Sequence, residues 1–343
     1  MSFSQSLEKA WYKKVSWALL LLPLSWVFRC IAYLRKAYIK YCVANPKLNV
    51  PVIVVGNISV GGTGKTPLLT TLIQWLQQQG YRPGVVSRGY GGCGHGERAS
   101  QYPYFVSTES SAGEAGDEPL LLSKYCPVMV DPDRYRAAKS LLEQTDCDLI
   151  LSDDGLQHYR LPRDIEIVLV DALRSFGNGQ CLPAGPLREP VSRLMDVDFV
   201  ISNGSSTDNS LKASHKLSIV PTLLRHLSSG GVIYVTTGIT KQNDWKAGYK
   251  VHAVAGIGNP QRFVQSLEQV GFEVELHAWP DHHGFNGNEF IFEDDLPVII
   301  TAKDAVKCTE LKNDNIWVLE VSAQPDESFL DELGKKLMEY RSG

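Results

Sequence analysis

The eight residues 59–66, with the sequence SVGGTGKT, have the residue types and spacing of a phosphate-binding loop (P-loop). The usual pattern is G-x-x-x-x-G-K-[ST], and this chain departs from it only at the first position, a serine. The glycines let the backbone curl until its N–H groups face a phosphate, Lys65 reaches the β and γ oxygens, and the Thr66 hydroxyl can bind Mg²⁺. We therefore expect an ATP–Mg²⁺ site, with Lys65 taking part in catalysis, built from Ser59, Gly61, Gly62, Thr63, Gly64, Lys65 and Thr66.

Two adjacent carboxylates follow a hydrophobic run later in the chain. Residues 149–152 read LILS, which is typical of a buried parallel strand, and Asp153 and Asp154 come directly after it. In a P-loop protein, an acid at this place holds Mg²⁺ together with the loop threonine. Successive strand residues point to opposite faces, so the two acids should have different roles unless the strand ends first. We predict that Asp153 binds Mg²⁺ and that Asp154 holds Mg²⁺-bound water or caps the next segment.

The elements that would position these residues alternate between strands and helices. Short apolar runs predict strands at 52–55, 84–87, 127–130, 149–152, 165–170 and 199–202, with helices at 66–79, 119–125 and 134–144. A polar segment, 203–247, is expected to contain the interdomain linker. The pattern then resumes, with strands at 251–255, 272–276, 297–301 and 316–320 and helices at 261–270 and 326–340. This alternation predicts an open parallel α/β sheet of the P-loop NTPase type, with helices on both faces, plus a second, smaller α/β domain.

Length and composition fit this division. A chain of 343 residues exceeds one typical core, and we predict an N-terminal segment over 1–40, a P-loop domain over 41–225 and a smaller domain over 226–343 that closes over the site. The net charge of −4 does not indicate a nucleic-acid partner. Seven cysteines without a C-x-x-C pair predict neither a disulfide framework nor a cysteine zinc site, and favour a reducing cytoplasm.

The first 40 residues are basic and apolar. They carry seven lysines and arginines against one acid, Glu8, on a chain whose remainder is acidic. The apolar run 15–28, which contains Pro23, is shorter than the roughly 20 residues that a spanning helix needs. Its aromatic and cationic flanks predict an amphipathic helix lying in the headgroup region of a membrane. The alternatives are a cleaved signal peptide, for which no small-x-small cleavage site follows, and a helix packed on the protein's own core.

Six short motifs resemble those of one enzyme family. In order they are Gly56-Asn57 leading into VGGTGKTP, then SRGYGG, GDEP, DDGLQH, LPAGPLREP and PDHH, and TAKDAVK at 301–307 is also similar to a family segment. Together they resemble tetraacyldisaccharide 4′-kinase, the lipid A 4′-kinase of Gram-negative bacteria. The resemblance implies transfer of phosphate from MgATP to the 4′-hydroxyl of a tetraacylated glucosamine disaccharide 1-phosphate. It also implies a peripheral position on the cytoplasmic face of the inner membrane, held by the N-terminal segment. We predict no obligate protein partner.

The resemblance also implies roles for individual residues. The acid of GDEP, Asp117, would orient the attacking hydroxyl and accept its proton, although the pattern alone equally allows a helix N-cap. The histidine of PDHH would pair with it, and His282 is favoured over His283. Substrate contacts are expected from two arginines, whose guanidinium groups suit phosphate, and from two polar residues that follow the paired acids: Arg88, Arg188, Gln157 and His158.

A P-loop regulatory NTPase that acts on a protein partner is the alternative from another class. It would need a guanine-reading motif or a docking surface, but residues 301–304 read TAKD, with alanine where the guanine motif has lysine. The segment 256–261, GIGNPQ, likewise lacks the third glycine of a dinucleotide-binding loop. A third reading is a soluble sugar kinase whose N-terminal helix packs on its own core.

Overall fold

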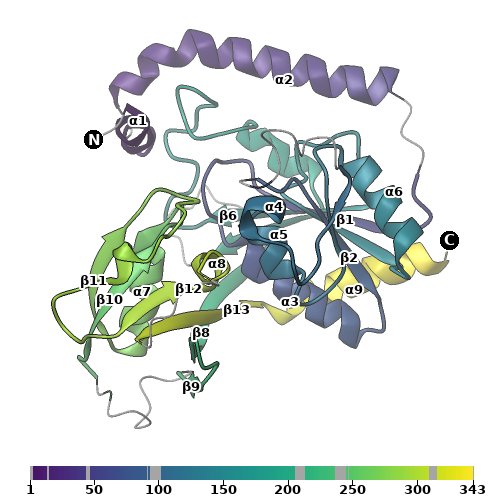
Figure 1. Ribbon diagram of the computed structural model, residues 1–343. Coiled ribbons are helices and arrows are strands. Elements are labelled where there is room, and N and C mark those ends of the chain that lie inside the picture. Colours follow the sequence, from purple (N-terminus) through teal and green to yellow (C-terminus); the bar gives the residue numbers. More distant parts are fainter. Residues whose placement is uncertain are drawn as a thin grey trace.

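The computed structural model describes residues 3–13, 15–43, 47–90, 92, 102–204, 213–235, 245, 247–308 and 315–342. One hydrogen-bonded sheet runs through these residues (Figure 1). Its strand order is β11-β10-β12-β13-β8-β7-β6-β1-β5-β2-β4-β3, with β9 paired to β8. Most pairs are parallel, which confirms the predicted α/β class. The pairs β3–β4, β8–β9 and β8–β13 are antiparallel, so the sheet is mixed.

The first sheet half holds the P-loop. Its strands are β1 (Val52–Gly56), β2 (Pro83–Ser87), β3 (Tyr104–Phe105), β4 (Val128–Val130), β5 (Leu149–Asp153), β6 (Ile165–Asp171) and β7 (Phe199–Asn203). All of them except β3 are buried along their whole length, which explains their continuous apolar sequences. Their helices are α3 (Lys65–Gln78), α4 (Ala112–Ala115), α5 (Asp117–Leu122), α6 (Arg134–Gln144) and η3 (Val191–Asp196).

Helices cover both faces of this half. Ile53 and Val55 of β1 belong to a core with α3, α5 and the C-terminal helix α9 (Glu327–Ser342), whereas Val52 and Val54 pack in another core with α6. Alternate residues of one strand therefore point into two different cores, as the period of a strand requires. The predicted helix 119–125 differs in its bounds, because α5 already begins at Asp117, after Gly116 with φ 88.

The second sheet half lies beyond a long antiparallel pair. Strands β8 (His215–His226) and β13 (Ile316–Pro325) pair from Leu217–Pro325 to His226–Trp317 and join the two halves into one sheet. The polar segment expected to contain the linker thus includes a long strand, followed by β9 (Val232–Tyr234). The alternation of buried and exposed residues in β8 is broken at Pro221, which lies opposite a register shift in β13. The sequence pattern therefore does not show the period of two that predicts a strand. The rest of this half comprises β10 (Lys250–Ala255), α7 (Pro260–Val270), β11 (Glu273–Ala278), η4 (Asn288–Phe290), β12 (Val298–Thr301) and α8 (Ala302–Ala305).

The N-terminal segment forms α1 (Phe3–Trp11), η1 (Trp17–Leu21) and α2 (Leu22–Cys42), and Figure 1 shows α2 extending along the outside of the body. Pro23 lies in the first turn of α2, where no backbone N–H is needed, so the helix continues past it. The stretch Trp17–Cys42 is long and apolar enough to cross a membrane, and only 11% of its most apolar window is buried.

Helix α2 touches the body at few points. Ser25, its buried residue, donates a hydrogen bond to the Cys181 carbonyl at 2.8 Å and accepts one from the Ala184 N–H at 3.0 Å. Apolar side chains along the helix are exposed instead: Leu24, Trp26, Val27, Ile31, Leu34 and Tyr38. This exposure does not fit the reading in which the helix packs on the protein's own core.

Candidate active site

The P-loop connects the buried end of β1 to the first turn of α3. Gly61 and Gly64 have φ of 105° and 94°, in the left-handed region that favours glycine. A Cβ at Gly64 would also collide with the side chains of Asn203 and Ile219. Asn203 Nδ2 donates to the Thr63 carbonyl at 2.8 Å, so the end of β7 fixes the loop. Two glycines of the motif are therefore required by the backbone itself.

Ser59, where the common motif has glycine, is held by a second segment of the chain. It forms an isolated bridge to Leu187, and its neighbour Val60 donates its N–H to the Pro186 carbonyl at 2.9 Å. Ser59 does not have a positive φ, so its Cβ is accommodated. The LPAGPLREP segment thus supports the start of the P-loop, a contact between residues far apart in sequence.

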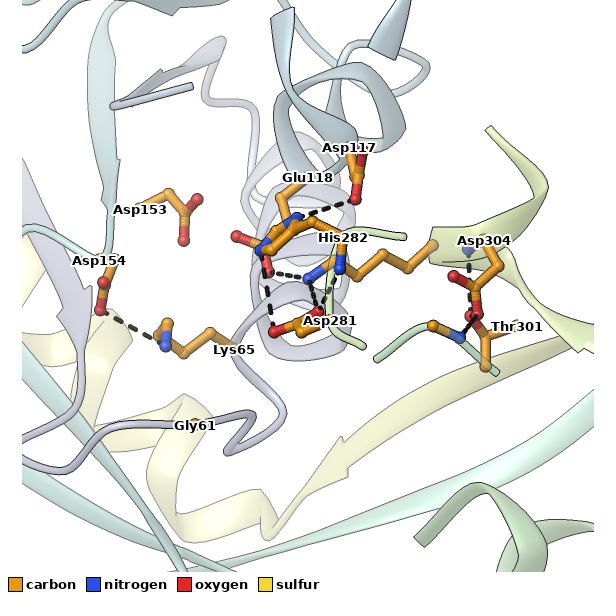
Figure 2. A network of polar contacts seen from close by, with 12 residues as sticks. Gly61, Lys65, Asp117, Glu118, Asp153, Asp154, Asp281, His282, Thr301 and Asp304 are labelled. Atoms are coloured by element: carbon orange, nitrogen blue, oxygen red, sulfur yellow. Dashed lines mark hydrogen bonds and ion pairs between the residues drawn. The ribbon is translucent and has the colours of Figure 1, made fainter. Parts of the chain in front are cut away.

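The two carboxylates at the end of β5, Asp153 and Asp154, line one cavity with the P-loop. The strand ends at Asp153, and Asp154 has φ 46°, so the alternation of a strand no longer separates the two side chains. Asp153 Oδ2 accepts a hydrogen bond from Ser87 Oγ at 3.0 Å. Asp154 forms an ion pair with Lys65 at 3.4 Å (Figure 2). It forms a second ion pair with Arg188 at 2.7 Å.

The environments of the two acids differ in charge. Burial raises the pKa of Asp153 to about 7, and the charges of Glu118 and Asp154 act in the same direction. Burial also opposes the charge of Asp154, but Lys65 and Arg188 hold the pKa of that carboxyl below its usual range. Asp153 Oδ1 is buried and has no hydrogen-bond partner among the described residues. A buried, unpartnered carboxylate oxygen in the cavity that Thr66 also lines fits the donor set of a Mg²⁺ ion.

A histidine–carboxylate pair joins the two sheet halves at the site. His282 Nδ1 lies 3.0 Å from Asp117 Oδ2, although 165 residues separate them (Figure 2). Asp117, in the first turn of α5, is 5% exposed. His282, after β11, has φ 62°, the kind of strained backbone that clusters at functional sites. Its neighbour His283 instead contacts Glu289 at 2.9 Å and stacks on Trp279.

Two lysines from the TAKDAVK segment lie beside this pair: Lys307 contacts Asp117, and Lys303 contacts Glu118 and Asp281, the chain neighbours of the two partners. The sequence analysis assigned neither lysine a role. Lys307 Nζ lies 3.8 Å from Asp117 Oδ2 and 2.7 Å from Asp304 Oδ1. Lys303 Nζ lies 3.3 Å from both Glu118 and Asp281, so it bridges the two sheet halves. Burial disfavours this charge, but neighbouring carboxylates, led by Glu118 and Asp281, raise the pKa of Lys303 to about 12. The only signal for these residues was the similarity of the whole segment to a family motif.

The four candidate substrate residues, Arg88, Gln157, His158 and Arg188, all line the same cavity. Gln157 Nε2 donates to Glu189 at 2.8 Å and to the Asn57 carbonyl at 3.2 Å. Burial lowers the pKa of the His158 imidazole to about 3, and the charges of Arg134 and Arg88 act in the same direction. His158 is therefore neutral at pH 7. Arg134, which is 2% exposed, also lines this cavity. The sequence analysis did not select it as a site residue, because its sequence context is that of an ordinary helix residue. Gly91 and 93–96, within and after SRGYGG, lie outside the described residues.

The cavity also reaches the N-terminal helix. Its lining includes P-loop residues, Asp153, Asp154 and His282, together with a run of α2 side chains from Trp26 to Lys36. The P-loop follows the central parallel strand β1, and the paired acids lie at the end of its neighbour in the sheet, β5. This arrangement defines a P-loop nucleotide-binding protein. The opening onto an exposed apolar helix sets it apart from P-loop proteins with a purely aqueous site.

Comparison with known proteins identifies the family. The model of the tetraacyldisaccharide-1-P 4′-kinase family matches residues 17–338, and the chain belongs to this family. It is 44% identical to the tetraacyldisaccharide 4′-kinase of Hahella chejuensis and 46% identical to that of Methylobacillus flagellatus, in both cases over 98% of this chain and 97% of the relative. A crystal structure of LpxK from Aquifex aeolicus in complex with ATP superposes with a TM-score of 0.72 at 28% identity, covering 94% of this chain and 98% of that one.

Proposed function

We propose that this protein transfers the γ-phosphate of ATP to the 4′-hydroxyl of a tetraacylated glucosamine disaccharide 1-phosphate, a step of lipid A biosynthesis. The observation that carries the proposal is one cavity lined by the P-loop, by His282, which contacts Asp117 through Nδ1, and by the exposed helix α2. A nucleotide and an acylated acceptor can meet in such a cavity. Family membership supports the identity of the acceptor.

ATP is proposed to bind through the P-loop. The amides of 61–66 and Lys65 Nζ would hold the β and γ phosphates, helped by the positive end of α3. Thr66 and Asp153, with Asp154 beside them, would hold Mg²⁺, and the unpartnered Oδ1 of Asp153 supports this assignment. When bound, the ion would neutralise negative charge on the phosphates, including the charge that develops on the leaving ADP. Asp154 keeps Lys65 and Arg188 aligned along the same phosphates.

Asp117 is proposed to act on the acceptor. Its carboxylate would orient the 4′-hydroxyl and take the proton as the oxygen–phosphorus bond forms and ADP leaves. His282 holds this carboxylate through Nδ1, and Lys307 supplies a fixed positive charge beside it. Arg88 and Arg188 are proposed to contact phosphate groups, and Gln157 and His158 to shape the acceptor side of the cavity.

The second sheet half is proposed to move with the reaction. Residues 226–343 contribute His282, Lys303 and Lys307, whereas 41–225 contribute the P-loop and Asp117, so the site is complete only when both parts meet. Closure over ATP and lipid would exclude water from the transferring phosphate. The segment 1–40 is proposed to place the protein as a peripheral enzyme on the cytoplasmic face of the inner membrane, where ATP and the acceptor are both available.

The test of this proposal is phosphate transfer from γ-labelled ATP to tetraacyl disaccharide 1-phosphate in mixed micelles with Mg²⁺. The wild type should label the lipid, and Asp117→Ala should do so at least about 10²-fold more slowly. Asp146→Ala changes an exposed acid between α6 and β5 and is the matched control, which should keep wild-type activity. If the wild type labels no lipid but hydrolyses ATP or GTP unaided, the protein is a regulatory NTPase and the proposal fails.

A further inference from the structure

A group of potential metal ligands lies on the outer strands of the second sheet half, apart from the residues that line the active-site cavity. His252 belongs to β10, and Glu275 and His277 belong to its parallel neighbour β11. Glu275 and His277 are two residues apart and therefore share one face of the strand. The pairing of His252 with Glu275 brings the third side chain to that same face. The register of the two strands thus gathers two imidazoles and a carboxylate.

The donor atoms are close to the spacing of metal ligands. His252 Nδ1 and His277 Nε2 are 3.0 Å apart. The Glu275 oxygens lie 4.0 Å from His252 Nδ1 and 3.8 Å from His277 Nε2. Ligands about 2.0–2.2 Å from a tetrahedral zinc ion are separated by roughly 3.3 Å. Glu275 is the most exposed of the three, so a small turn of its side chain would close the triangle.

A second carboxylate fixes the ring of His252 from behind. His252 Nε2 lies 3.0 Å from Asp294 Oδ1, and the ring stacks on Phe292 with centroids 3.8 Å apart. A proton on Nε2 that is donated to Asp294 leaves the lone pair of Nδ1 facing His277 and Glu275. Histidine ligands of metals very often donate their other N–H to a carboxylate in this way.

We propose that His252, His277 and Glu275 bind a divalent transition metal ion of the zinc type, with water in the fourth position and Asp294 as the outer partner of His252. Two imidazoles and one carboxylate suit zinc better than magnesium or calcium, which prefer all-oxygen sites. Because β11 lies at one end of the sheet order, the ion would tie this edge strand to β10. The site is independent of the kinase chemistry and of the Mg²⁺ proposed there.

Zinc binding by the full-length, chelator-treated protein without an affinity tag tests the proposal. We expect one Zn²⁺ per chain by competition with a chromophoric chelator, an increase in the thermal midpoint with Zn²⁺, and visible absorption bands of tetrahedral Co²⁺ in place of zinc. His277→Ala and Glu275→Gln should each weaken binding about 10-fold or more and abolish the thermal shift. Glu273 is an exposed acid on the same face of β11 and forms an ion pair with Lys250. The matched control Glu273→Gln should therefore bind zinc like the wild type.

Among the described residues, the exposed thiols of Cys30 and Cys42 are the competing source of metal binding. The double variant Cys30→Ser/Cys42→Ser should therefore retain the zinc-dependent thermal shift. Equal zinc affinity for the wild type and His277→Ala would overturn the proposal, as would loss of binding in the cysteine variant alone. So would the absence of binding in a wild-type protein that is folded by circular dichroism. The three side chains would then be a hydrogen-bonded group only.

Discussion

Removal of the Lys307 charge should destabilise the protein strongly. The Lys307 and Asp304 side chains are 6% and 0% exposed, and their charged atoms are 2.7 Å apart. The substitution Lys307→Met keeps most of the volume but leaves Asp304 as a buried, uncompensated charge. Removing one partner of such a pair typically costs about 3–5 kcal/mol of unfolding free energy. The same change takes a cation away from Asp117, so kcat for lipid phosphorylation should fall as well.

Urea denaturation followed by tryptophan fluorescence measures this loss. The matched control is Lys139→Met, which breaks an i,i+4 ion pair with Glu143. Both side chains of this pair are 64% exposed, so its loss should lower the unfolding free energy by only about 0.3–0.5 kcal/mol. The double variant Lys307→Met/Asp304→Asn leaves no unpaired charge, so it should lose less than the sum of the two single changes. The reasoning is refuted if Lys307→Met is as mild as Lys139→Met, or if the two single effects simply add.

Three further predictions concern single side chains of the site. His158 has a folded pKa of about 3 against a normal 6.5, so the unfolded chain binds more protons between these values and stability is lost as the pH falls. Between pH 7.5 and 5, His158 should lower the unfolding free energy of the wild type by about 1–2 kcal/mol. In parallel urea titrations, His158→Gln should lack this part of the pH-dependent loss. Gly64→Ala should add about 1–2 kcal/mol of backbone strain and weaken binding of a fluorescent ATP analogue by more than about 10-fold, whereas unchanged affinity would contradict the left-handed loop. His282→Ala should lower kcat by about 10²-fold with little change in the KM for MgATP, and a rise in that KM alone would place His282 on the nucleotide instead.

Local sequence was sufficient for the nucleotide half of the site. A P-loop is encoded within eight residues, because its function depends on backbone conformation, one lysine and one hydroxyl. Asp153 and Asp154 could be found for a similar reason, since a buried parallel strand leaves a continuous apolar run that ends at the acids. The strands on either side were predicted within one or two residues, because burial on both faces gives them an unambiguous composition.

Sequence periodicity missed the elements whose environment changes along their length. Strand β8 crosses from one sheet half to the other, alternates buried and exposed residues irregularly, and contains a proline opposite a register shift. Such a strand looks polar and loop-like until its partner β13 is known. Helix α2 begins within the apolar run 15–28 and continues to Cys42, because a proline in the first turn of a helix does not end it.

The sequence by itself determined that this chain contains a P-loop motif, that its first sheet half is built mostly from buried parallel strands, and, through ordered motifs, which family it belongs to. Only the tertiary structure decided that His282 rather than His283 contacts Asp117, that Lys303 and Lys307 surround that contact, and that one cavity includes both the P-loop and α2. The physical reason is one of range. A phosphate loop is a property of neighbouring residues, whereas a charge pair between residues 165 positions apart exists only once a sheet has brought its two halves together.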